Sequence, residues 1–110
     1  MKLNELEQII NDAFNSKQNI SDKSDKKIID AINQTIELTD KGDLRVAEKK
    51  NGKWSVNQWV KKAILLSFRT NKMTVSRGPY TTWYDKVPGK SVTWNENDWK
   101  QAGYRHVPNG

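Results

Sequence analysis

The stretch from Leu44 to Asn71 constrains the fold most, because it joins a strong turn signal to the most apolar continuous segment of the chain. Asn51-Gly52 favours a type I′ turn, which needs two residues that tolerate positive φ. A two-residue turn sets the cross-strand pairs, which are Lys50 with Lys53, Lys49 with Trp54 and Ala47 with Val56. With this pairing, apolar residues lie on both faces of the two-stranded ribbon. We therefore predict a β-hairpin that helices cover on both sides.

A helix is predicted directly after the hairpin. Apolar residues recur there at helical spacing, at Trp59, Val60, Ala63, Ile64 and Phe68. Ser55 or Asn57 is expected to cap its start, and Arg69 to stabilise its negative end. Trp54 and Trp59 are expected in the core, because a chain this short with five tryptophans must bury several of them.

Two amphipathic helices are predicted before the hairpin. Their apolar stripes are Leu3, Leu6, Ile10, Ala13 and Phe14 in the first, and Ile28, Ile29, Ile32 and Ile36 in the second. Ser21, Ser24 or Asp25 is expected to cap the second helix, and Gly42 to end it in the left-handed conformation. We expect both helices to cover the hairpin and the third helix.

The pattern weakens after Asn71. A short strand is predicted around Met73 and Val75, then a turn at Gly78-Pro79 and an irregular aromatic segment with Tyr80, Trp83 and Tyr84. Asn95 is expected to cap a short helix over 96–102 that Gly103 closes, and 104–107 reads as a final strand. The prediction is an α+β fold whose parts are a helical pair (1–42), a hairpin plus helix (43–71) and a C-terminal segment (72–110).

Composition narrows the class of protein. The net charge of +6 raises the alternative of a small nucleic-acid-binding module, which would use Lys49, Lys50, Lys53, Lys61 and Lys62. These lysines are interleaved with acids, which favours an ordinary solvated surface. There is no cysteine and a single histidine, so neither a disulfide framework nor a histidine zinc cluster is expected. The longest apolar run is too short to span a bilayer, and the start is amphipathic, so we expect a cytoplasmic protein.

Three ordered blocks of sequence resemble one known family. The first runs from Leu44-Arg45-Val46-Ala47-Glu48-Lys49 through Gly52-Lys53-Trp54 to Leu65-Leu66-Ser67-Phe68-Arg69. The others are Trp83-Tyr84-Asp85-Lys86-Val87-Pro88 and Gly103-Tyr104-Arg105-His106-Val107-Pro108. Together they resemble the N-terminal domain of tetrahydrodipicolinate N-succinyltransferases, across essentially the whole chain.

The resemblance implies an acyltransferase of lysine biosynthesis by the diaminopimelate pathway. Such an enzyme transfers the succinyl group of succinyl-CoA to tetrahydrodipicolinate and works as a homotrimer. In that family a left-handed β-helix that holds the coenzyme site follows the Val-Pro motif, and this sequence contains no hexapeptide repeats. We therefore expect an isolated N-terminal domain that binds no cofactor, has no activity alone and has neither a membrane nor a nucleic acid as partner.

Arg105 is the one site residue that the resemblance suggests, as a substrate-binding arginine. A guanidinium can hold one carboxylate of a dicarboxylate in a bidentate pair. The plain alternative is an exposed surface arginine near a terminus. No catalytic acid or base and no metal ligand is assigned, and Asp85, Lys86 and His106 are left without a role.

Overall fold

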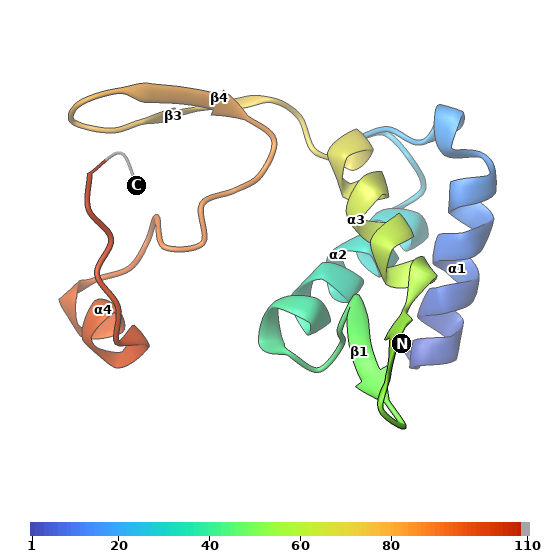
Figure 1. Cartoon of the computed structure of the whole chain (residues 1–110). Helices are drawn as coiled ribbons and strands as arrows, with labels where there is room; N and C mark the ends of the chain where they lie inside the picture. The colour runs from blue at the N-terminus through green and yellow to red at the C-terminus, as the bar shows by residue number, and fades with distance from the viewer. Residues whose placement is uncertain (109–110) are drawn as a thin grey trace. The chain divides into compact units, whose positions relative to one another are not determined.

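The computed structural model describes residues 1–108, and the chain divides into two compact units, Met1–Lys72 and a second unit that begins at Met73. The first unit contains α1 (Leu3–Asn15), the 3₁₀ helix η1 (Lys17–Asn19), α2 (Lys26–Lys41), β1 (Ala47–Lys50), β2 (Lys53–Val56) and α3 (Gln58–Thr70). The second contains β3 (Thr74–Arg77), β4 (Thr82–Asp85) and α4 (Glu96–Ala102) (Figure 1). The predicted α+β class is confirmed.

The core of the first unit lies between α1, α2 and α3. All three predicted helices are confirmed, and they pack on one another through most of their apolar stripes, although Leu3 and Phe68 are 51% and 43% exposed. The fully buried cluster comprises Leu6, Ile10, Ala13, Ile20, Ala31, Ile32, Ala63 and Leu66. Thr35 is also buried, and its hydroxyl donates to the Ala31 carbonyl at 2.7 Å, which satisfies the polar group inside the bundle.

The predicted end of α2 is confirmed, but the predicted side-chain cap at its start does not form. Gly42 adopts the left-handed conformation (φ 84°) as predicted, and the Asp43 N–H donates to the Leu38 carbonyl at 2.9 Å. At the start, Asp25 occupies the cap position, but its side chain makes no capping hydrogen bond. The Ser24 hydroxyl instead accepts from the Ser21 N–H at 2.8 Å and so stabilises the preceding turn.

The hairpin forms with the predicted register. Ala47 pairs with Val56, Lys49 with Trp54 and Lys50 with Lys53. Asn51 and Gly52 have φ values of 51° and 79°, which are the positive angles that a type I′ turn requires.

The prediction that helices cover this hairpin on both faces is wrong. Trp54 is 72% exposed and Val56 is about half exposed. The buried core is built from α1, α2, α3 and Ile20, and the hairpin contributes no residue to it. Trp59 does pack against the core, at its edge.

Asn57 joins the hairpin to α3. Its side-chain amide donates to the Arg45 carbonyl at 2.6 Å and to Glu48 Oε2 at 3.0 Å, and its backbone N–H donates to the Val46 carbonyl at 2.7 Å. The predicted capping role is therefore wrong for its side chain, which makes no capping bond to α3. An amide that already donates to β1 is held away from the start of the helix.

In the second unit, β3 and β4 form an antiparallel hairpin in which Val75 pairs with Tyr84 and Ser76 with Trp83. The predicted strand near Val75 is confirmed, but the part of the aromatic segment that holds Trp83 and Tyr84 is a strand and not irregular. The Gly78 N–H donates to the Thr81 carbonyl at 2.8 Å, which closes the turn. The Trp83 ring lies close over Gly78, where a Cβ would come within 2.9 Å of it. The turn between Gly78 and Thr81 and the Trp83 ring together hold β4 against β3.

The short helix α4 begins and ends as predicted. Asn95 Oδ1 accepts from the Asp98 N–H at 3.0 Å, and the Asp98 carboxylate accepts from the Asn95 N–H at 2.9 Å, which completes a capping box. Gly103 ends the helix with φ 75°. The predicted strand over 104–107 is wrong, because no strand within residues 1–108 pairs with this segment, and a strand needs such a partner.

Candidate functional site

Aromatic rings gather around α4 in the second unit. The ring centres of Trp94 and Trp99 lie 4.8 Å apart, and those of Trp99 and Tyr104 lie 5.4 Å apart, both in edge-to-face orientation. The His106 ring lies 6.0 Å from that of Trp99. The turn at Gly103 brings Tyr104 back onto the helix, so that this small unit has an ordered aromatic cluster.

An open depression of about 490 Å³ lies beside this cluster. Its lining residues are Glu96, Trp99, Lys100, Gly103, Tyr104 and Arg105. We call it the α4 depression. It contains Arg105, the residue that the sequence singles out, together with the aromatic side chains of Trp99 and Tyr104.

The charge of the α4 depression is positive on balance. Lys100 Nζ lies 3.6 Å from Glu96 Oε1, and both side chains are largely exposed, so this pair is weak. Arg105 is exposed, and within residues 1–108 its guanidinium has no ion-pair or hydrogen-bond partner. All five of its N–H donors are therefore open to a ligand, which is the arrangement that carboxylate recognition needs.

Asp85 and Arg69, which were also considered from the sequence, do not line the α4 depression. Asp85 ends β4, where its backbone carbonyl accepts a bond from the Thr74 hydroxyl at 3.4 Å. Arg69 lies in the first unit, at the end of α3. The sequence did not indicate that Trp99 and Lys100 line a depression with Arg105. The sequence did contain a signal for this arrangement, namely the cap at Asn95 and the glycine at 103 that bound α4. A helix that ends at a left-handed glycine reverses the chain onto its own last turn.

Within the described residues, no group of three or more His, Cys, Asp or Glu side chains is arranged to hold a metal ion. Over that same part of the chain, every helix is too short or too polar to traverse a lipid bilayer.

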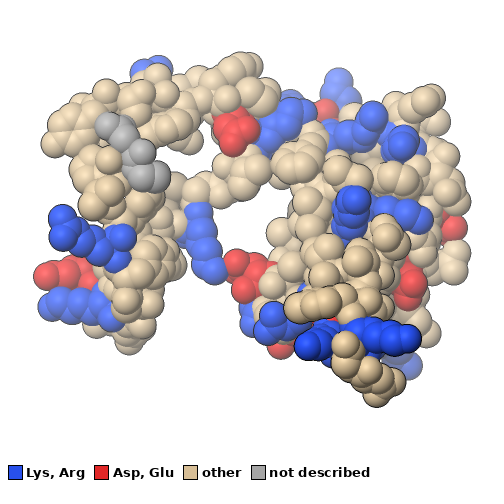
Figure 2. Space-filling model, viewed as in Figure 1, with Lys and Arg blue, Asp and Glu red and all other residues tan. Residues whose placement is uncertain are grey.

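Lysine and arginine side chains do not form one continuous surface in the view of Figure 2. They lie at several separate places, with aspartate and glutamate among them. On the hairpin, Lys50 Nζ lies 3.2 Å from Glu48 Oε1, so one of the clustered lysines has an acidic partner. This distribution resembles an ordinary charged surface more than a stripe for nucleic-acid phosphates.

Comparison with known proteins gives one consistent result. Residues 5–70 match the family model described as Tetrahydrodipicolinate N-succinyltransferase N-terminal. In an alignment over 110 residues that covers 97% of this chain, the sequence is 57% identical to the 2,3,4,5-tetrahydropyridine-2,6-dicarboxylate N-succinyltransferase of Pelagibacter ubique. It is 48% identical, with the same coverage, to the protein of that name from Agrobacterium fabrum. The nucleic-acid alternative has no support from these comparisons.

The two kinds of match cover different parts of the chain. The family model ends at Thr70 and so covers α1 to α3, whereas the relatives also cover the segment with Arg105. The chain spans about two fifths of the length of these relatives, 40% and 39%. On the residues matched, this chain belongs to the tetrahydrodipicolinate N-succinyltransferase N-terminal family.

Proposed function

We propose that this chain acts as the amino-terminal part of an enzyme that transfers a succinyl group from succinyl-CoA to tetrahydrodipicolinate. The family match and the names of the relatives support the proposal. Because the chain spans about two fifths of those relatives, the activity is proposed for the longer assembly and not for these residues alone.

The proposed reaction is an acyl transfer to nitrogen. Water opens the cyclic imine of the substrate, and the amine so formed attacks the thioester carbonyl of succinyl-CoA. The new C–N bond is an amide, the C–S bond breaks, and the proton lost by the amine is balanced by the thiol of free coenzyme A. The product is N-succinyl-2-amino-6-oxopimelate.

Arg105 is the residue of this chain that we propose to contact the substrate. The observation that carries this assignment is its exposed guanidinium, which has no partner within residues 1–108 and lines the α4 depression. A bidentate pair with one carboxylate would orient the dicarboxylate, so the contribution is positioning and not proton transfer. We propose that succinyl-CoA, and the group that moves the proton, bind outside this chain.

A chimeric enzyme tests the function. Residues 1–110 replace the matching segment of the Pelagibacter ubique relative, and release of coenzyme A is followed with a thiol reagent. We expect tetrahydrodipicolinate-dependent release from the chimera and none from the 110-residue chain alone. The control is the relative's remaining segment without residues 1–110. The proposal would be contradicted if the chimera folds but releases no more coenzyme A than this control.

The role of Arg105 is tested in the same chimera. Arg105→Lys keeps the charge but loses the bidentate fork, so we expect KM for tetrahydrodipicolinate to rise about tenfold and KM for succinyl-CoA to stay unchanged. Arg77→Lys, on β3 of the same unit, is the matched control. Equal kinetics of the two variants would remove Arg105 from the site.

We also propose that the assembled enzyme is a cytoplasmic homotrimer. Light scattering on the chimera measures its mass directly, and fractionation of expressing cells locates it. A monomeric or dimeric mass in an active chimera would contradict the proposed trimer.

A further inference from the structure

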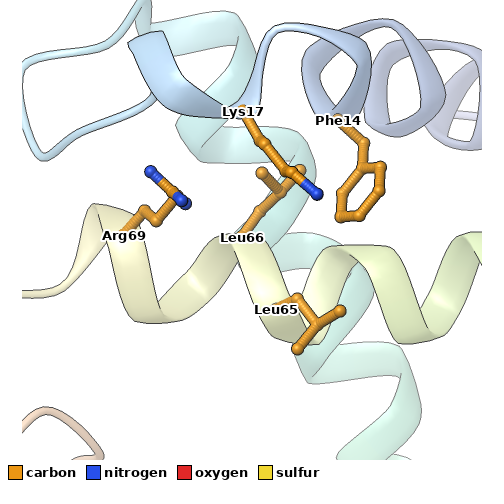
Figure 3. Close-up of a pocket in the computed structure, with 5 residues that line it drawn as sticks. All are labelled: Phe14, Lys17, Leu65, Leu66 and Arg69. Carbon is orange, nitrogen blue, oxygen red and sulfur yellow. The ribbon is translucent and has the colours of Figure 1, made fainter.

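A second cavity lies in the first unit, between α3 on one side and the end of α1 and start of η1 on the other (Figure 3). We call it the α1–α3 pocket. Its lining residues are Phe14, Lys17, Leu65, Leu66 and Arg69. Leu66 is 1% exposed and forms the floor, while Leu65 on the same helix is 44% exposed. The pocket therefore exposes apolar surface of Leu65 directly beside the buried Leu66.

Two cations, Lys17 and Arg69, line the pocket, and a third, Lys62, lies near its Phe14 ring. Lys17 Nζ lies 4.6 Å from the centre of the Phe14 ring, and Lys62 Nζ lies 5.3 Å from it. Figure 3 shows Arg69 and Leu66 rising from α3 toward the segment that carries Lys17. Lys62 donates to Asn11 Oδ1 at 3.1 Å, which is a neutral acceptor.

Among residues 1–108, no carboxylate forms an ion pair with these cations, Lys17, Lys62 and Arg69. Arg69 was expected to serve the end of α3, yet its guanidinium makes no hydrogen bond to the helix carbonyls in that part of the chain. Like charges held together without a counterion repel, so an anion placed among them is bound favourably.

The volume of the pocket limits the size of the anion. It is about 210 Å³, which corresponds to roughly seven waters at ~30 Å³ each. Drug-sized ligands and cofactors need pockets of about 300–1,000 Å³. A body the size of a phenyl ring or a branched alkyl chain matches this space.

We propose that the α1–α3 pocket binds a small organic carboxylate with an aromatic or branched apolar body. The body lies on Phe14, Leu65 and Leu66, and the carboxylate accepts hydrogen bonds from Lys17 and Arg69. A free amino acid is disfavoured, because its ammonium group would meet the same cations. This site is distinct from the α4 depression and does not depend on the proposed acyl transfer.

The test is an NMR titration of the ¹⁵N-labelled 110-residue chain with phenylacetate. We expect saturable shifts of the backbone amides of 14–17 and 65–69. The neutral isostere 2-phenylacetamide has the same body without the charge, and we expect it to bind at least about tenfold more weakly. Equal binding of the two compounds, or no saturable shift in these segments, would overturn the proposal.

A double variant separates a specific site from general attraction to a basic protein. K17Q/R69Q removes both proposed ligands, and K53Q/K61Q removes two exposed positive charges outside the pocket. We expect the first to abolish saturable binding of phenylacetate and the second to change its Kd less than about twofold. If the two variants bind alike, the pocket is not the site. Circular dichroism of both shows that the helical bundle remains folded, since all four side chains lie at the surface.

Discussion

The side-chain amide of Asn57 lies 3.0 Å from Glu48 Oε2 and donates a hydrogen bond to it. These residues are at the start of α3 and within β1, and the same amide also donates to the Arg45 carbonyl. One side chain therefore holds the hairpin to the helix that follows it. A strand that lacks a buried face needs such a polar attachment.

Replacement of Asn57 tests this attachment. We expect Asn57→Ala to lower the free energy of unfolding by about 1–2 kcal/mol, because the Arg45 carbonyl and the Glu48 carboxylate lose their donor. Asn57→Ser restores a good helix cap but not the reach of the amide. Urea unfolding followed by circular dichroism measures both. If serine recovers the wild-type stability, the side chain acts through the helix and not through β1.

The pH dependence of stability follows from Glu48. The hydrogen bond from Asn57, followed by that from Lys50, lowers the pKa of Glu48 below its usual 4.5. The unfolded state therefore binds more protons in this range, so the contribution is complete above about pH 4.5 and is lost as the pH falls toward the lower folded pKa. We expect Glu48→Gln to flatten this acid limb in urea unfolding measured from pH 6 to 3. An unchanged limb would show that other carboxylates produce it.

Leu66 and Leu65 form a matched pair on α3. Leu66 is buried between the helices, so we expect Leu66→Ala to destabilise the first unit by about 2–5 kcal/mol. Leu65→Ala, at the exposed position, should cost about 1 kcal/mol or less. Thermal unfolding of the two variants compares them directly. Similar losses would mean that the bundle is packed differently around α3.

Gly103 controls the shape of the α4 depression. Its φ of 75° disfavours any side chain, although a Cβ there would meet no atom within 4 Å. We expect Gly103→Ala to cost about 1–2 kcal/mol of backbone strain and to weaken the contact between Trp99 and Tyr104, as read from NMR cross-peaks between the rings. Gly42→Ala carries the same strain in the first unit and should leave these cross-peaks intact.

The sequence by itself determined what depends on neighbouring residues. The turn at Asn51-Gly52, the left-handed stops at Gly42 and Gly103, the cap at Asn95 and the helices α1 to α3 all follow from local backbone preferences or from apolar spacing along one element. Arg105 was singled out by a local motif as well, and its substrate contact stays a prediction.

Only the tertiary structure decided what depends on distant partners. Trp54 is exposed because the buried apolar residues of α1, α2 and α3 pack against one another and not against the hairpin. The strand β4 forms because its backbone pairs with that of β3. The segment over 104–107 has the residues of a strand but no strand to pair with among those described. Lys17 and Arg69 are 52 positions apart and line one pocket only because α1 packs beside α3. Burial and pairing depend on which surfaces remain free after the helices pack, and a one-dimensional pattern does not contain that information.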